Sequence, residues 1–213
     1  NCAPCLDVKD PEGHQVIGDR AYSDNPTVVA KLGRAAANGL LAGGVLPIIK
    51  HIPGHGRATV DSHSELPIVR AYEQELVDRD FHPFQDLADL PLGMTAHVLF
   101  SSIDPEAPCT LSEKLISQVI RQQIGFNGLL FTDDLSMQAL GGSISERTGR
   151  ALKAGCDVAL HCNGQAHEMR SVAENCPLLS EQGQQRWRTA LNFRREPQTQ
   201  TRNELLAELE SIM

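Results

Sequence analysis

The stretch "VLPIIKHI", residues 45–52, is an apolar run that ends in a lysine and a histidine. A run of this length without polar alternation is typical of a strand buried on both faces of a parallel sheet. Three further stretches have the same character: "LGMTAHVLF" (92–100), "GLLFTDDL" (128–135) and "DVALHC" (157–162). "CAPCLDV" (2–8) is also predicted to be a strand. The sequence therefore predicts about five strands.

Helical patterns separate these strands. In "NPTVVAKLGRAAANGLLAGG" (25–44), Asn25 is a good helix cap, Pro26 suits the first turn, and two glycines end the pattern. Further helices are predicted at 71–89 (broken near Pro83), 110–125, 143–155, 165–175, 180–195 and 202–213. Strands that alternate with helices indicate a parallel sheet with crossover connections.

Two α/β architectures have this alternation, an open doubly wound sheet and a (β/α)8 TIM barrel. No GxGxxG motif follows a predicted strand, which argues against a dinucleotide-binding sheet. Polar residues stand where the strands end, and in a barrel such positions converge on one mouth. These residues are Asp7, Lys50, His51, His97, Asp133, Asp134 and His161. The sequence therefore favours the barrel.

The chain has 213 residues, whereas a typical barrel needs about 250. Its first residues already belong to a predicted buried strand. We therefore expect part of a TIM barrel that lacks its N-terminal strands. Residues 1–195 are predicted to form the C-terminal part of the barrel domain, and 196–213 a polar linker with a terminal helix.

The charge and composition of the chain limit the kinds of binding partner and the compartment that we expect. The net charge is -8 and the pI about 5.4, which argues against nucleic acid or an anionic membrane surface as a partner. No apolar run approaches the roughly 20 residues that span a bilayer, and no leader segment opens the chain. Six cysteines are too few for a disulfide scaffold. We expect a cytoplasmic protein with mostly reduced thiols.

The loop "KHIPGHGRATVDSH", residues 50–63, is dense in titratable groups and broken by glycine and proline. Asp61 stands two residues before His63, close enough for the carboxylate to orient the imidazole for proton transfer. A surface ion pair is the simpler interpretation of Asp61. The two interpretations are equally open from these residues alone.

"FTDDLSM", residues 131–137, places Asp133 and Asp134 at the end of a predicted buried strand. Glycoside hydrolysis needs a carboxylate at the oxocarbenium-like centre and a second group that protonates the departing oxygen. Either aspartate could be the first group, and a histidine could be the second. A helix cap is the alternative role for each aspartate.

A metal site is a further alternative, since His51, His55, Asp61 and His63 are all ligand types. The HxxxH spacing crosses Pro53 and Gly54, so the two rings need not share a face. The HExxH motif is absent from the sequence. A metal-dependent hydrolase is therefore the less favoured interpretation.

Taken in this order, "KHIPGHGRATVDSH" and "FTDDLSM" resemble the signature of bacterial β-N-acetylhexosaminidases of glycoside hydrolase family 3, of the peptidoglycan-recycling type. "IGDRAYSDNP" (17–26) is similar to a further family segment. The resemblance extends from "LDV" to "LHCNG". It implies a single (β/α)8 barrel, no cofactor, and a GlcNAc-containing muropeptide as the substrate.

The resemblance also implies roles for individual residues. Asp133 matches the nucleophile that forms a covalent glycosyl-enzyme, His63 the general acid/base, and Asp61 its carboxylate partner. The residues that match sugar-binding positions are Arg20, Lys50 and His51. Asp134 is expected to make structural hydrogen bonds.

The resulting hypothesis is a retaining exo-β-N-acetylglucosaminidase. Three alternatives stay open at this point: a catalytically silent fragment that binds a sugar or a partner, a glycosyl phosphorylase, and a metal-dependent hydrolase. A histidine acid/base does not repel an anionic nucleophile, which keeps the phosphorylase open.

Overall fold

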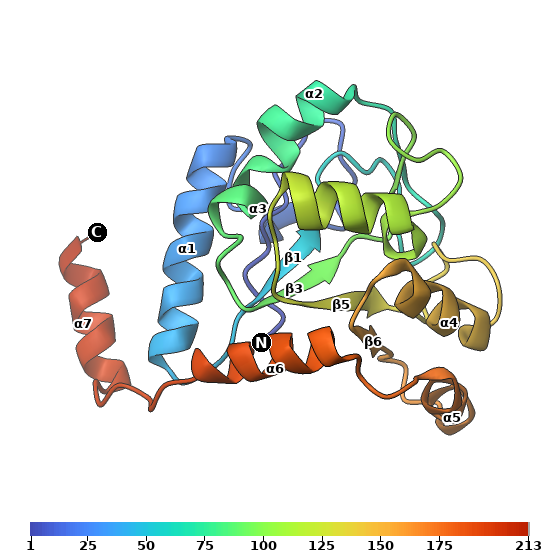
Figure 1. The fold of residues 1–213 in the computed structure, drawn as a ribbon. Helices are drawn as coiled ribbons and strands as arrows, with labels where there is room; N and C mark the ends of the chain where they lie inside the picture. Colours follow the sequence, from blue (N-terminus) through green and yellow to red (C-terminus); the bar gives the residue numbers. More distant parts are fainter. Residues whose placement is uncertain (213) are drawn as a thin grey trace.

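The computed structural model describes residues 1–212 and has an α/β fold around a four-stranded parallel sheet (Figure 1). The strands lie in the order β1 (Ile48–Ile52), β3 (Leu92–Thr95), β5 (Leu129–Asp134) and β6 (Val158–Leu160). A doubly wound sheet reverses its strand order at a switch point, whereas a barrel sheet continues in one direction. The observed order continues in one direction, as the predicted barrel requires.

Helices and short turns connect these strands. α1 (Pro26–Ala42) precedes β1, and α4 (Ile144–Ala154) joins β5 to β6. The β1–β3 connection contains β2 (Ile68–Val69), α2 (Glu73–Glu75), the π-helical turn η2 (Leu76–Asp80) and α3 (His82–Asp86). The β3–β5 connection contains β4 (Leu99–Phe100), the 3-10 turn η3 (Cys109–Leu111) and the π-helix η4 (Leu115–Gln123). The remaining elements are the 3-10 turn η1 (Gly18–Arg20), α5 (Ala166–Asn175), α6 (Glu181–Asn192) and α7 (Arg202–Ile212).

The helix ends follow local sequence signals. The Asn25 side chain accepts hydrogen bonds from the backbone N–H groups of Thr27 and Val28, at 2.9 and 3.3 Å, and so caps α1 as predicted. Ser143 and Glu146 form a capping box at the start of α4. Each of these caps satisfies N–H groups that have no partner within the helix.

Two predicted strands differ from the observed ones. Segment 2–8 contributes a single bridge, between Cys5 and Lys50, because Pro4 has no N–H to donate to a ladder. The predicted strand 92–100 is two strands, since β4 leaves the main sheet and pairs with β2 instead. The break near Pro83 is confirmed, and α3 begins there.

The two faces of the main sheet are covered differently. One face packs against α1, α3 and η4 in a large apolar cluster that includes Ile49 and Leu130. The other face carries Leu92 and Leu129, which pack with Ala190 of α6. In Figure 1, α6 runs past the amino ends of the strands. The carboxyl ends, where the polar residues lie, are not covered by this helix.

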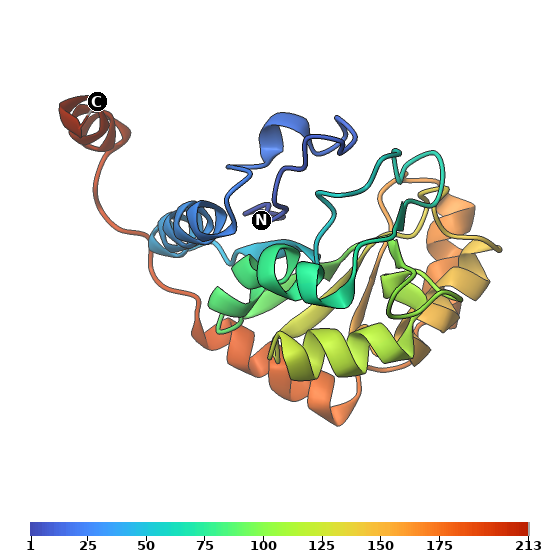
Figure 2. The same ribbon diagram turned by 90° about the horizontal axis from the view of Figure 1, so that it is seen from above.

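The C-terminal helix α7 stands apart from the sheet and its helices (Figure 2), and none of its residues is buried. The exposed segment 194–201 leads to it along the end of α1, where the Gln198 N–H donates to the Ala42 carbonyl at 2.8 Å. The predicted division at residue 195 is compatible with this arrangement and stays a prediction. Within residues 1–212, the helices lack the length and apolarity needed to cross a membrane.

Candidate active site

A cavity of about 250 Å³ lies at the carboxyl ends of β1 and β5. It gathers five of the six predicted site residues: Arg20, Lys50, His51, His63 and Asp133. These residues come from η1, β1, the loop after β1, and β5. The sixth, Asp61, is hydrogen-bonded to His63. The structure therefore brings the six residues together, and their roles stay predictions.

Asp133 is a carboxylate of this cavity that has basic side chains around it. Burial opposes its ionisation, but His51, His97, the Asp134 backbone N–H and Lys50 outweigh burial and lower the pKa of Asp133. The nearest of these contacts joins His51 Nε2 to Asp133 Oδ2 at 3.8 Å. Asp133 is therefore held as a carboxylate, the form that a nucleophile needs.

Asp134 makes structural hydrogen bonds, as expected. Its Oδ1 accepts from the backbone N–H groups of Ser136 and Cys162, at 3.0 and 3.1 Å. Its Oδ2 accepts from the Ser136 hydroxyl at 2.6 Å. Asp134 thus ties the end of β5 to the turn that follows and to the residues after β6.

Asp61 and His63 form a dyad at the mouth of the cavity. Asp61 Oδ1 lies 2.8 Å from His63 Nδ1 and accepts the His63 backbone N–H at 2.9 Å. That backbone hydrogen bond is the largest cause of the lowered pKa of Asp61. An ionised Asp61 accepts the Nδ1 proton, so the Nε2 atom of His63 is the one left to exchange a proton with a ligand.

The loop that carries the dyad, residues 53–63 (the dyad loop), is held in place near both of its ends. Near the dyad, the Gln138 N–H donates to the His63 carbonyl at 3.2 Å, and the Ala139 N–H donates to the Ser62 carbonyl at 3.1 Å. Near its start, Gly56 packs so closely on the backbone of Val8 that a Cβ atom would lie 1.8 Å from the Val8 oxygen. A glycine is therefore required here for close packing.

The two basic residues complete the cavity wall. The Arg20 guanidinium donates to the Val16 carbonyl at 2.5 Å through Nη2 and also lines the cavity. Lys50 lies in β1 next to His51. Both side chains can donate hydrogen bonds to sugar hydroxyls.

Two of the strand-end histidines lie outside this lining. His161 Nε2 pairs with Glu168 Oε2 at 2.8 Å, and His97 Nε2 donates to the Asp134 carbonyl at 3.0 Å. Cys162, one residue after His161, takes the place in the cavity wall. Side chains alternate between faces near a strand end, so a shift of one residue decides which one enters a pocket.

The family resemblance gave no role to Asp7 or to His55, yet Asp7 is buried beside the cavity and His55 is a buried part of its lining. Asp7 Oδ2 lies 2.6 Å from His51 Nδ1, and His55 Nε2 lies 3.0 Å from Ser62 Oγ. Burial, followed by the charge of His51, lowers the pKa of His55 to about 4. Asp7 was visible in the sequence only as a polar residue at the end of a predicted strand.

The residues suggested as metal ligands do not gather as a set in residues 1–212. The one cluster of ligand-type atoms there is Cys5, Asp7 and His51, whose atoms lie within 4.8 Å of one another. The Cys5 Sγ–H donates to Asp7 Oδ2 at 3.1 Å, and burial raises the pKa of the Cys5 thiol. A metal would have to displace this proton and the His51 Nδ1 proton, so we interpret the cluster as a hydrogen-bond network.

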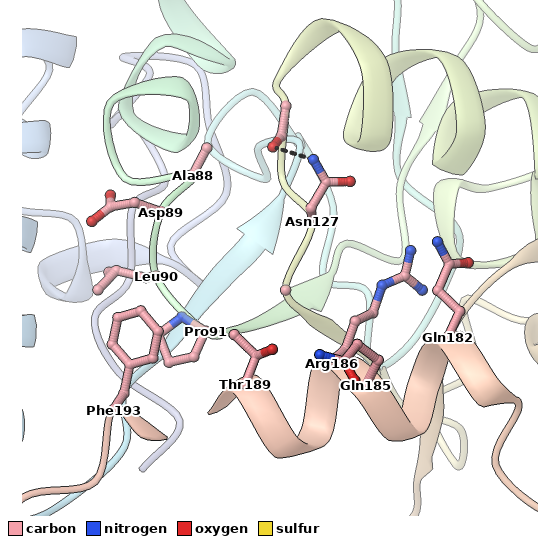
Figure 3. Close-up of a pocket in the computed structure, with 12 residues that line it drawn as sticks. Ala88, Asp89, Leu90, Pro91, Asn127, Gln182, Gln185, Arg186, Thr189 and Phe193 are labelled. Carbon is pink, nitrogen blue, oxygen red and sulfur yellow. Dashed lines mark hydrogen bonds between the residues drawn. The ribbon is translucent and has the colours of Figure 1, made fainter. Parts of the chain in front are cut away.

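A larger cavity, of about 570 Å³, lies at the amino ends of β3 and β5 against α6 (Figure 3). Arg186 lines it and is paired with Asp157 at 2.9 Å, and Asn127 donates to the Gly125 carbonyl at 3.2 Å. The acidic residue of its lining, Asp89, pairs with Arg34. The smaller cavity instead gathers a carboxylate, a lysine and the dyad histidine at the carboxyl ends of the strands, and it is therefore the candidate active site.

The fold and the site together are those of a barrel enzyme. A carboxylate and a histidine–carboxylate dyad lie at the carboxyl ends of its parallel strands. The family described as "Glycosyl hydrolase family 3 N terminal domain" matches residues 1–189. The chain belongs to this family.

Named relatives agree with this assignment. A beta-hexosaminidase of Nitrosomonas eutropha is 42% identical over 164 residues, which cover 75% of this chain and 47% of the relative. A beta-hexosaminidase of Idiomarina loihiensis is 38% identical over 187 residues, covering 86% and 56%. The chain thus spans about half the length of the curated relatives it matches.

Solved structures are similar over nearly the whole chain. NagZ from Neisseria gonorrhoeae, in complex with N-trifluoroacetyl-D-glucosamine, superposes with a TM-score of 0.83 at 32% identity, over 98% of this chain and 62% of that chain. A family 3 β-N-acetylglucosaminidase from Paenibacillus superposes with a TM-score of 0.80 at 30% identity, over 91% and 39%. The parallel sheet therefore corresponds to part of the fold of these glycosidases.

Proposed function

We propose that this chain carries the catalytic centre of a retaining exo-β-N-acetylglucosaminidase. One observation carries the proposal: the ionised Asp133 and the Asp61–His63 dyad meet at one cavity at the carboxyl ends of the strands. The names of the relatives, and the glucosamine derivative bound to NagZ, support N-acetylhexosamine as the sugar.

In the proposed first step, an Asp133 oxygen attacks the anomeric carbon and forms a covalent glycosyl-enzyme. The glycosidic bond breaks, its electron pair goes to the departing oxygen, and His63 Nε2 gives that oxygen a proton. In the second step His63 takes a proton from water, which attacks the same carbon and releases Asp133. Asp61 stabilises the imidazolium form of His63.

Arg20, Lys50 and His51 are proposed to bind the hydroxyl groups of the sugar. All three line the cavity beside Asp133. We extend the proposal to a GlcNAc-containing muropeptide in the cytoplasm as the natural substrate, which the family resemblance supports. Residues 1–195 are proposed to contribute the barrel part, and 196–213 a separate C-terminal extension.

The test is release of nitrophenol from 4-nitrophenyl β-GlcNAc by the protein and by its Asp133→Ala variant. We expect turnover by the first and none by the second, with unchanged activity in a chelator. Product analysis in phosphate buffer separates free GlcNAc from a sugar phosphate. Full activity of Asp133→Ala, or loss of activity with the chelator, contradicts the proposal.

A further inference from the structure

Asp7 lies fully buried beside the candidate active site and has so far been given no role. Its two carboxylate oxygens have separate partners. Oδ1 accepts the backbone N–H groups of His51 and His55, at 3.3 and 2.6 Å. Oδ2 lies 2.6 Å from His51 Nδ1 and accepts the Cys5 thiol at 3.1 Å. Three of these four partners, the two backbone N–H groups and the thiol, are hydrogen-bond donors.

These donors determine the ionisation of Asp7. Burial opposes the charged form, but the charge of His51, its hydrogen bond and the charge of His55 together hold the pKa of Asp7 well below its usual range. A carboxylate only accepts hydrogen bonds. The Nδ1 atom of His51 must therefore carry a proton.

The proton on Nδ1 limits the hydrogen-bonding role of Nε2, the other nitrogen of the His51 ring. His51 Nε2 lies 3.8 Å from Asp133 Oδ2, at the wall of the cavity. With Nδ1 committed to Asp7, Nε2 faces Asp133 either as the acceptor of a neutral ring or as the donor of an imidazolium that Asp7 stabilises. The chain Asp7–His51–Asp133 thus has the arrangement in which a buried carboxylate orients an imidazole toward a reacting group.

We propose that Asp7 is a positioning residue that fixes the tautomer and charge of His51 beside Asp133 and anchors the start of the dyad loop. This inference rests on the proposed function. Asp7 touches no reacting atom and acts through His51.

The variant Asp7→Asn has a defined structural consequence. Its oxygen has to keep accepting the backbone N–H groups of His51 and His55, so its –NH₂ group is left facing His51 Nδ1. Because an amide nitrogen only donates, the ring proton must move from Nδ1 to Nε2. The shape of the side chain is nearly unchanged and Nε2 still faces the cavity, but this nitrogen now carries the ring proton and can no longer accept one.

The first readout is the ¹⁵N NMR spectrum of His51, assigned by its loss in His51→Gln. We expect a protonated Nδ1 in the wild type and a protonated Nε2 in Asp7→Asn. This measurement needs no turnover, and once the His51 signals are assigned the wild-type spectrum alone can refute the inference. A wild-type ring with its only proton on Nε2 overturns it.

The second readout is kinetic. With 4-nitrophenyl β-GlcNAc, Asp7→Asn should lower kcat/KM by about 10²-fold or more, as in other carboxylate–histidine pairs. In a His51→Gln background the same change should cost less than about threefold, since coupled residues are not additive. Cys5→Ser keeps a donor on the same carboxylate oxygen and should stay within about threefold of the wild type, as the matched control.

Fully additive losses at Asp7 and His51, or wild-type kcat/KM in Asp7→Asn, overturn the inference. Thermal melting of each variant separates loss of folding from loss of activity. A wild-type protein that cannot turn over the substrate refutes the proposed function, whereas the His51 spectrum still decides whether Asp7 sets the ring. The two failures are therefore distinguishable.

Discussion

Asp133 and Asp134 are adjacent, yet the structure gives them opposite expected responses to substitution. Asp134 accepts three hydrogen bonds, from Ser136 N, Ser136 Oγ and Cys162 N. Hydrogen bonds to a charged group contribute about 1.5–3 kcal/mol each to stability. Asp134 is half-buried, so water compensates for part of this stabilisation when the bonds are lost. We expect Asp134→Ala to lower the free energy of unfolding by about 3 kcal/mol.

For a chain of this size such a loss lowers the Tm by about 6–12 °C. Asp134→Asn keeps the oxygen that accepts both backbone N–H groups, so its loss should stay below about 1 kcal/mol. Asp133→Asn is the matched control in the neighbouring position. It should leave the Tm within about 2 °C of the wild type while abolishing turnover.

Thermal and urea unfolding of the three variants, followed by assays of the folded ones, check this prediction. If Asp134→Ala melts like the wild type but loses activity as Asp133→Asn does, then Asp134 takes part in the chemistry.

Three further predictions concern the dyad loop. Gly56→Ala should destabilise the protein by about 3 kcal/mol or more, measured by urea unfolding, since its Cβ would lie 1.8 Å from the Val8 oxygen; a stability equal to the wild type would show that the loop can move away. His63→Ala should retain slow hydrolysis of dinitrophenyl β-GlcNAc and lose hydrolysis of a disaccharide, whose leaving group needs a proton; equal losses on both substrates would remove His63 as the acid. Burial and His51 lower the pKa of His55 to about 4, below its unfolded value of about 6.5. Between these two pH values the unfolded chain binds a proton that the folded protein does not, so stability should fall as the pH drops from about 6.5 to 4. His55→Gln should reduce this slope in urea titrations, and an unchanged slope would show that His55 is protonated in the fold.

The parts of the fold that could be predicted from sequence are those set by local signals. Asn25, Ser143 and the continuous apolar runs mark their elements without reference to the rest of the chain. The pairing of β2 with β4 could not be predicted, because two-residue strands carry no period. The long run 92–100 gave no sign that its end leaves the main sheet.

In the site, the loop of residues 50–63 and the pair Asp133 and Asp134 could be found from the sequence, because the residues of each motif are close together in the chain. The role of Asp7 was not, since its partner His51 lies 44 positions away and is brought to it by the Cys5–Lys50 bridge. The sequence also did not show that Cys162, rather than His161, lines the cavity. The pairing of β5 with β6 shifts between Phe131 and Asp134, which sequence alternation does not reveal.

The proposed mechanism requires Asp133 to form a covalent glycosyl-enzyme. His63→Ala lacks the group that activates water, so dinitrophenyl β-GlcNAc should load the enzyme faster than water clears it. Intact mass spectrometry should then show the gain of one N-acetylglucosaminyl group, located at Asp133 by peptide mapping and absent from the His63→Ala/Asp133→Ala double variant. No adduct despite released dinitrophenol, or an adduct on another residue, would rule out a glycosyl-enzyme on Asp133.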